Sequence, residues 1–142
     1  MTSLARNKER IFVYGTLRKD SKNRMYRILS RDADFVGERT FIGKLYNIGE
    51  YPGAVHSSDP DEVVKGEVYA LRNPNSILRV LDEYEGCGPG DPSSTEFRRE
   101  KVNISLENGE NINAWIYIYN RSIDGLKVIP SGDYTQFIEL KQ

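Results

Sequence analysis

The sequence has 142 residues, of which 20 are Lys or Arg and 21 are Asp or Glu, so its formal net charge is -1. This length suits one domain with a real core, and we expect a single domain over residues 1–142 with its core at about residues 10–140. The near-neutral charge disfavours a nucleic-acid partner, because phosphate backbones attract basic surfaces. No stretch has the apolar length of a membrane span or the pattern of a signal peptide, so we expect a cytoplasmic protein with no membrane partner.

Histidine and cysteine each occur once, as His56 and Cys87. A single cysteine permits no internal disulfide, and no pair of ligands has metal-site spacing. His56 lies in the polar run 56–61, which favours a solvated loop over a Ser-His-Asp device. A nucleophilic Cys87 would need a basic neighbour to form its thiolate, and residues 86–92 contain none. We therefore expect no metal and no cofactor, and any chemistry must use carboxylates and backbone amides.

Six segments are rich in strand-forming residues and bounded by turn formers, which predicts strands. They are residues 10–14, 33–38, 40–46, 62–71, 97–106 and 111–119. The last two flank Asn108-Gly109, the strongest short signal for a hairpin. Gly66 lies inside a strand and indicates a bulge or a close approach of backbone. The Pro-Gly step in residues 51–55 fits a tight bend better than a central strand.

Residues 111–119 place apolar side chains on both faces of their strand, with Ile116 on one face and Tyr117 on the other. A strand covered on both faces suits a barrel wall or an enclosed sheet. A helix is expected to begin at Asp20 or Ser21, after the first strand. Together with a second helix at residues 73–86, these elements predict an α+β protein with a strongly curved sheet of about seven strands.

The helix at residues 73–86 is predicted from a capping Asn and a Pro at its start and from Gly86 at its end. Its apolar arc consists of Ile77, Leu78, Val80, Leu81 and Tyr84. Glu85 follows Leu81 by four residues and falls within the stripe that faces the core. A carboxylate there loses hydration and meets the negative end of the helix dipole, and both effects raise its pKa. Glu85 is then a candidate proton carrier, unless the helix frays and the side chain points into water.

Four motifs occur along the chain in the order Tyr14-Gly15-Thr16-Leu17, Tyr51-Pro52-Gly53, Leu81-Asp82-Glu83-Tyr84-Glu85-Gly86 and Phe97-Arg98. No single motif is specific: the first alone equally fits an ordinary strand-to-helix turn or a backbone anion site. The ordered set resembles the γ-glutamylcyclotransferase-like family, which includes γ-glutamylamine cyclotransferases, bacterial YtfP-type proteins and plant AIG2-like proteins. The resemblance runs from about Ile11 to Tyr134, and it implies a small mixed β-barrel of about six to seven strands with a few flanking helices.

The resemblance also implies a reaction on a small-molecule partner, a γ-glutamyl amine or a short γ-glutamyl peptide. The substrate's own α-amine would attack its γ-carbonyl and release 5-oxoproline and a free amine. The implied acid–base is Glu85, the last residue of the Leu-Asp-x-x-Glu motif. The implied substrate-binding residues are Tyr14, Gly15, Thr16, Leu17, Tyr51 and Tyr134. The alternative is a non-catalytic small-molecule binding module of the same fold.

Two features depart from the family's pattern. Phe97 stands where the family often has Tyr, which removes a hydroxyl donor. The loop at residues 86–94 is rich in Gly and Pro and is expected to reshape the amine side of the pocket. Both departures bear on which amine the protein accepts.

Overall fold

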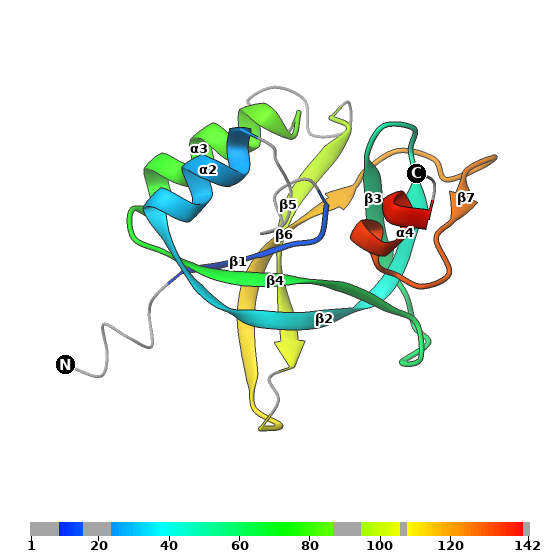
Figure 1. Ribbon diagram of the computed structural model, residues 1–142, viewed down its shortest axis with the longest axis horizontal. Coiled ribbons are helices and arrows are strands. Elements are labelled where there is room, and N and C mark those ends of the chain that lie inside the picture. Colours follow the sequence, from blue (N-terminus) through cyan, green and yellow to red (C-terminus); the bar gives the residue numbers. More distant parts are fainter. Residues whose placement is uncertain (1–8, 16–23, 87–94, 106–107, 141–142) are drawn as a thin grey trace.

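The computed structural model describes residues 9–15, 24–86, 95–105 and 108–140 (Figure 1). Its strands are β1 (Arg10–Val13), β2 (Ala33–Asn47), β3 (Pro52–His56), β4 (Val63–Leu71), β5 (Phe97–Ser105), β6 (Asn111–Tyr119) and β7 (Lys127–Val128). Its helices are α2 (Arg24–Asp32), α3 (Pro74–Tyr84) and α4 (Tyr134–Leu140). The predicted start of a helix at residues 20–21 lies outside the described residues.

Five strands form a closed barrel. They are hydrogen-bonded in the order β1-β4-β2-β3-β6, and β6 pairs back with β1. The pairs β1–β6 and β3–β6 are parallel, whereas the other pairs in the ring are antiparallel, so the barrel is mixed. β5 extends the sheet from β6, and β7 pairs with β2. This architecture confirms the predicted α+β barrel.

The longest strand, β2, has 15 residues and pairs with β3, β4, β5 and β7. The sequence predicts two strands here, and that prediction is wrong. The register against β4 shifts between Phe35 and Gly37, which marks a β-bulge. A bulge bends and twists a strand without ending its pairing, so one continuous strand can follow the curved wall of the barrel.

The predicted bend at residues 51–55 is also wrong, because β3 is a strand of the barrel between β2 and β6. Pro52 is the first residue of the strand, a position at which proline is tolerated in sheets. A Cβ on Gly53 would lie 2.9 Å from the Cβ of Tyr119 on β6. Gly53 is therefore required for the close packing of the two strands rather than for a turn.

Gly66 brings β4 close to β1. A Cβ at this position would lie 2.3 Å from the carbonyl oxygen of Val13, a separation that real Cβ atoms do not show. The predicted close approach of backbone at this glycine is confirmed. It sets the position of β1, whose end carries Tyr14 and Gly15.

Apolar clusters cover both faces of the barrel wall, as the pattern of residues 111–119 predicts. The inner cluster fills the barrel and includes Phe12, Ile116 and Tyr134. The outer cluster lies between the wall and two helices and includes Val13, Leu29 of α2 and Leu81 of α3 among others. Figure 1 shows α2 and α3 side by side over β1, with α4 on the other side of the barrel near β3 and β7.

Helix α3 begins at Pro74, which lies in its first turn, but the side chain of Asn73 makes no capping hydrogen bond. The buried face of α3 is narrower than predicted: Ile77, Leu78 and Leu81 are buried, whereas Val80 and Tyr84 are 41% and 44% exposed. Val80 and Tyr84 lie next to each other on one side of the apolar arc, so the helix meets the barrel along the other side, which Ile77, Leu81 and Leu78 form.

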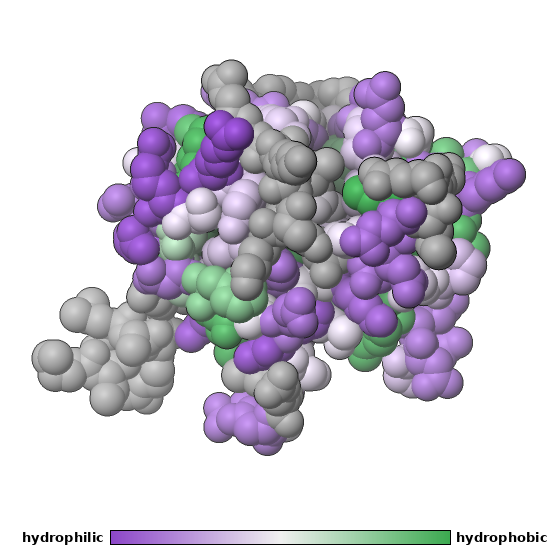
Figure 2. Space-filling view, in the orientation of Figure 1, coloured by the Kyte–Doolittle hydropathy of each residue, from purple (hydrophilic) through white to green (hydrophobic). Residues whose placement is uncertain are grey.

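The face of the molecule seen in Figure 2 has both hydrophobic and hydrophilic side chains. Figure 2 shows hydrophobic side chains in small groups separated by hydrophilic ones. Among the helices that the structure describes, none combines the length and apolarity needed to cross a bilayer.

Candidate active site

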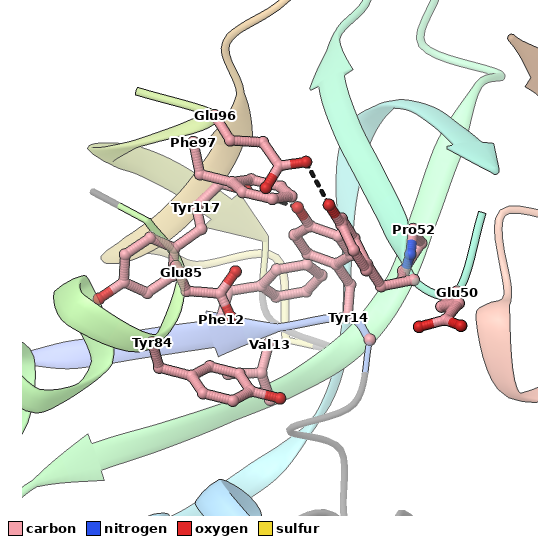
Figure 3. A pocket seen from close by; sticks show the side chains of 12 residues that line it. Phe12, Val13, Tyr14, Glu50, Pro52, Tyr84, Glu85, Glu96, Phe97 and Tyr117 are labelled. Atoms are coloured by element: carbon pink, nitrogen blue, oxygen red, sulfur yellow. Dashed lines mark hydrogen bonds between the residues drawn. The ribbon is translucent and has the colours of Figure 1, made fainter. Parts of the chain in front are cut away.

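A cavity of about 400 Å³ opens where β1, the segment before β3, the end of α3 and the start of β5 converge (Figure 3). Its lining residues are Phe12, Val13, Tyr14, Gly15, Glu50, Tyr51, Pro52, Tyr84, Glu85, Glu96, Phe97 and Tyr117. A cavity of this size holds a small molecule. It brings together the motifs around Tyr14, Tyr51, Glu85 and Phe97, which are far apart in the sequence.

Glu85 lies directly after the last residue of α3 and points into the cavity (Figure 3). Its backbone N–H still donates to the carbonyl oxygen of Leu81, at 2.9 Å, so the helical path continues up to this residue. The side chain is partly buried. Of the two interpretations that the sequence leaves open, the structure has the one in which Glu85 faces inward.

The environment of Glu85 favours its protonated form. Burial of the carboxyl and, second, the negative charge of Glu96 raise the pKa of Glu85 from 4.5 to about 7. A group with a pKa near 7 both accepts and donates a proton readily at neutral pH. Desolvation is the larger cause, as the position of Glu85 on the inward stripe predicts.

Asp82 fixes the end of α3 to the barrel. Arg99 of β5 donates from Nε to Oδ1, at 2.8 Å, and from Nη2 to Oδ2, at 3.1 Å. Tyr117 of β6 also donates its hydroxyl to Oδ1, at 2.7 Å. A bidentate Arg–carboxylate pair is strong and geometrically specific. Because Glu85 is three residues further along, this pair positions the acid relative to the cavity wall.

Tyr14 joins strands through its side chain and also lines the cavity. The buried hydroxyl donates to the carbonyl oxygen of Tyr117, at 2.5 Å, and accepts from the backbone N–H of Ala54, at 3.2 Å. Burial and the nearby charge of Glu85 raise the pKa of Tyr14, so the hydroxyl keeps its proton. The side chain therefore holds β1 against β3 and β6.

Tyr14→Phe is expected to lower the free energy of unfolding by roughly 2–4 kcal/mol, because two buried backbone groups lose their partner at about 1–3 kcal/mol each. Urea unfolding monitored by circular dichroism measures the change. Tyr46→Phe is the matched control: Tyr46 is also buried, and its hydroxyl makes no hydrogen bond within the described residues. A loss of stability in the control as large as that in Tyr14→Phe would contradict the structural role of the Tyr14 hydroxyl.

Gly15 lies against Pro52, and both line the cavity. A Cβ on Gly15 would lie 3.0 Å from Cγ of Pro52, so a side chain there would narrow the cavity. Thr16 and Leu17, which are also predicted to bind substrate, lie outside the described residues. The structure thus places the first half of the predicted backbone cradle beside Glu85.

Tyr51 donates a hydrogen bond from its hydroxyl to Oε2 of Glu96. This bond, followed by burial and the charge of Glu96, raises the pKa of Tyr51 to about 12. Phe97 lies next to Glu96 in the sequence, and its ring centroid is 6.1 Å from that of Tyr51. The hydroxyl of Tyr51 therefore lies in the part of the cavity that Phe97 also lines.

Tyr134 is not among the lining residues. Its hydroxyl donates to the carbonyl oxygen of Glu50, at 2.9 Å, and Glu50 does line the cavity. Tyr134 thus supports the cavity wall from the α4 side. His56 pairs with Glu100, at 2.7 Å, on the exposed surface, and neither residue lines the cavity.

Three polar lining residues lie outside the four motifs and are not among the predicted site residues: Glu50, Glu96 and Tyr117. Glu96 precedes Phe97, which the resemblance marks, so its proximity to that motif is the one signal it has. Tyr117 is identifiable only as a residue of the outward face of its strand. Cys87, the alternative nucleophile, lies outside the described residues.

The fold and the cavity define an α+β barrel protein with a pocket of small-molecule size. A family model described as "Gamma-glutamyl cyclotransferase, AIG2-like" matches residues 11–136. The chain belongs to this family. The match confirms the resemblance that the four ordered motifs indicate.

Similar proteins agree with this assignment. The chain is 36% identical over 126 residues to the γ-glutamylcyclotransferase family protein YtfP of Escherichia coli K12, covering 88% of this chain and 95% of that protein. It is 32% identical over 114 residues to the γ-L-glutamyl-butirosin B γ-glutamyl cyclotransferase of Niallia circulans, covering 78% and 67%. The solution structure of ytfP from Escherichia coli superimposes with a TM-score of 0.62 at 34% identity, covering 91% of this chain and 98% of that one.

Proposed function

We propose that the protein is a γ-glutamylcyclotransferase-type enzyme that cyclises a γ-glutamyl amine or a γ-glutamyl peptide to 5-oxoproline and a free amine. The observation that carries the proposal is Glu85, a partly buried carboxylate that faces the cavity beside the end of β1 and has a pKa of about 7. The family assignment and the names of its relatives support the same reaction class.

The first step is proton transfer from substrate to enzyme. The α-amine of a γ-glutamyl compound is an ammonium at neutral pH and has no lone pair for attack. Glu85 accepts one proton from it, and the neutral amine then attacks the γ-carbonyl carbon. The new C–N bond closes a five-membered ring, and the π electrons of the carbonyl move to its oxygen.

The second step returns the proton. The tetrahedral species collapses, the bond between the γ-carbon and the leaving nitrogen breaks, and protonated Glu85 donates its proton to that nitrogen. The ring nitrogen, which still carries two hydrogens, loses one of them as a proton to the released amine, which leaves as an ammonium. One carboxyl thus serves as base and then as acid, and no water is consumed. General acid–base catalysis of this kind typically contributes about 10²–10⁴-fold.

Positioning supplies much of the remaining acceleration. Because nucleophile and carbonyl belong to one molecule, holding the substrate in a near-attack conformation contributes up to roughly 7–11 kcal/mol in well-oriented systems. The cradle assigned to this task is the backbone around Gly15, whose missing side chain leaves room beside Pro52. Backbone N–H groups in such a turn hold the substrate carboxylate or the developing oxyanion.

Incubation of the purified protein with γ-glutamyl-ε-lysine, glutathione and γ-glutamyl amino acids is expected to yield 5-oxoproline and amine in equal amounts. The control is the α-N-acetylated form of each substrate, which has no nucleophilic amine and is expected to give no product. Chromatography with mass detection distinguishes 5-oxoproline from glutamate, the product that hydrolysis would give.

Two results would contradict the proposal. Release of glutamate, or equal turnover of the acetylated substrates, would mean that water rather than the α-amine attacks. Stabilisation of the protein in a thermal-shift assay without product from any substrate would favour the non-catalytic binding module.

A further inference from the structure

In the described part of the chain, the charged residues that line the cavity are all acidic. Three of its lining residues, Glu50, Glu85 and Glu96, are acidic, and none of the lining residues in the described part of the chain is basic. One carboxylate suffices for the proton transfers of the proposed reaction. Glu96 raises the pKa of Glu85, but it takes no direct part in these proton transfers.

Glu96 is held in place from two sides. Its carbonyl oxygen accepts from the backbone N–H of Asn120, at 2.7 Å, which fixes the residue just before β5. Its Oε2 accepts from the hydroxyl of Tyr51. The raised pKa of Tyr51 keeps this hydroxyl a donor over the whole physiological range. A carboxylate fixed in this way is preorganised to bind a ligand, because little side-chain entropy remains to be lost.

The second carboxylate oxygen of Glu96, Oε1, has no partner among the described residues. Within the described residues, no hydrogen bond or ion pair reaches Oε1, and no Lys or Arg lies within salt-bridge distance of either oxygen. Arg121 is close enough to Tyr51 to act on its pKa, but it does not line the cavity. A partly buried carboxylate without a cation is a costly arrangement that a bound cation relieves.

The position of Glu96 relative to Glu85 indicates which part of a substrate it would meet. In Figure 3, Glu96 lies on one side of the Glu85 carboxylate and β1 lies on the other. The γ-glutamyl group is assigned to the β1 side, and its scissile amide must lie at Glu85. The leaving amine then extends toward the side of Glu96.

We infer, on the basis of the proposed function, that Glu96, oriented by Tyr51, is a specificity-determining residue that selects leaving amines with a second, positively charged group. The preferred substrates are γ-glutamyl derivatives of diamines, in which one nitrogen forms the scissile amide and the distal ammonium pairs with Oε1 of Glu96. The ammonium takes no part in bond breaking, so its pairing strengthens binding of substrate and transition state alike and acts mainly through KM.

The test compares two substrates of equal length, γ-glutamyl-1,5-diaminopentane and γ-glutamyl-n-pentylamine, which differ only in the terminal ammonium. The wild-type protein is expected to prefer the diamine in kcat/KM by roughly 10- to 100-fold, the range of a charge-assisted hydrogen bond. In Glu96→Gln this ratio is expected to fall to near unity. The ratio is the readout because any change in the pKa of Glu85 affects both substrates equally.

Glu110→Gln is the matched control, since it removes one negative charge at the exposed β5–β6 hairpin, away from the cavity. Its ratio is expected to equal that of the wild type. A second measurement needs no variant: raising the salt concentration from about 0.05 to 0.5 M shortens the Debye length and is expected to reduce the wild-type preference.

Three outcomes would overturn the inference. They are a wild-type ratio near unity, a ratio in Glu96→Gln equal to that of the wild type, and an equal loss on both substrates, which would place Glu96 at the shared γ-glutamyl group. All three require 5-oxoproline from at least one substrate. A protein that forms none from either would instead contradict the proposed function.

Discussion

Glu85→Gln is expected to release 5-oxoproline about 10²–10⁴-fold more slowly than the wild type, the usual contribution of a general acid–base group. The amide keeps the size and shape of the side chain, but it cannot accept the proton of the α-ammonium or return one to the leaving amine. The loss is expected in kcat, with a smaller change in KM, because the proton transfers belong to the reaction step. Product formation over time, followed with the best substrate of the panel, measures it.

Glu83→Gln is the matched control for this experiment. Glu83 lies in the same turn at the end of α3, but its side chain is exposed and does not line the cavity. Its turnover is expected to match that of the wild type. Undiminished turnover in Glu85→Gln, with circular dichroism showing an intact fold, would mean that another group moves the protons.

The same substitution is expected to make stability less dependent on pH. In the folded protein the pKa of Glu85 is raised from 4.5 to about 7, so between these values the folded state binds more protons than the unfolded state. Stability then falls as pH rises through this window, by up to roughly 3 kcal/mol for a shift of this size. Gln carries no charge, so the stability of Glu85→Gln does not fall in this way as the pH rises. Relative to the wild type, the variant is expected to gain stability between pH 5 and pH 8.

Urea unfolding of the wild type, Glu85→Gln and Glu83→Gln at the two pH values measures this difference. Glu83→Gln is expected to follow the wild type, because exposed surface substitutions usually change stability by less than about 0.5 kcal/mol. Parallel pH dependence in all three proteins would show that Glu85 titrates as an ordinary carboxylate. The expected gain also means that the charged form of Glu85 is kept at the expense of stability, as is common at active sites.

The parts of the fold that follow from the sequence are those set by local rules. The alternation of residues 111–119 and the Asn-Gly turn before them predict the β5–β6 hairpin, and the structure has it, with φ +88° at Gly109. The prediction fails where tertiary contacts override such rules. The Pro-Gly step resembles a bend, but Pro52 opens a strand whose Gly53 is required by the nearness of Tyr119.

The candidate site likewise has one residue that local sequence rules predict and one that they do not. The four-residue spacing from Leu81 predicts the inward position of Glu85, because both residues lie on one helix and its geometry is regular. Glu96 has no such pattern. It meets Glu85 only because the start of β5 is brought beside the end of α3 by the closure of the barrel. The residue pattern within one segment cannot predict a contact between two segments that are far apart in the sequence.

Tyr14 directly follows β1, and its hydroxyl bridges β3 and β6, two neighbouring strands of the ring that pair in parallel. One residue therefore holds neighbouring strands of the barrel together and also lines the pocket that contains Glu85. A substitution that removed these contacts would therefore also change the wall of the pocket. Tyr14 thus couples the stability of the barrel to the shape of the pocket.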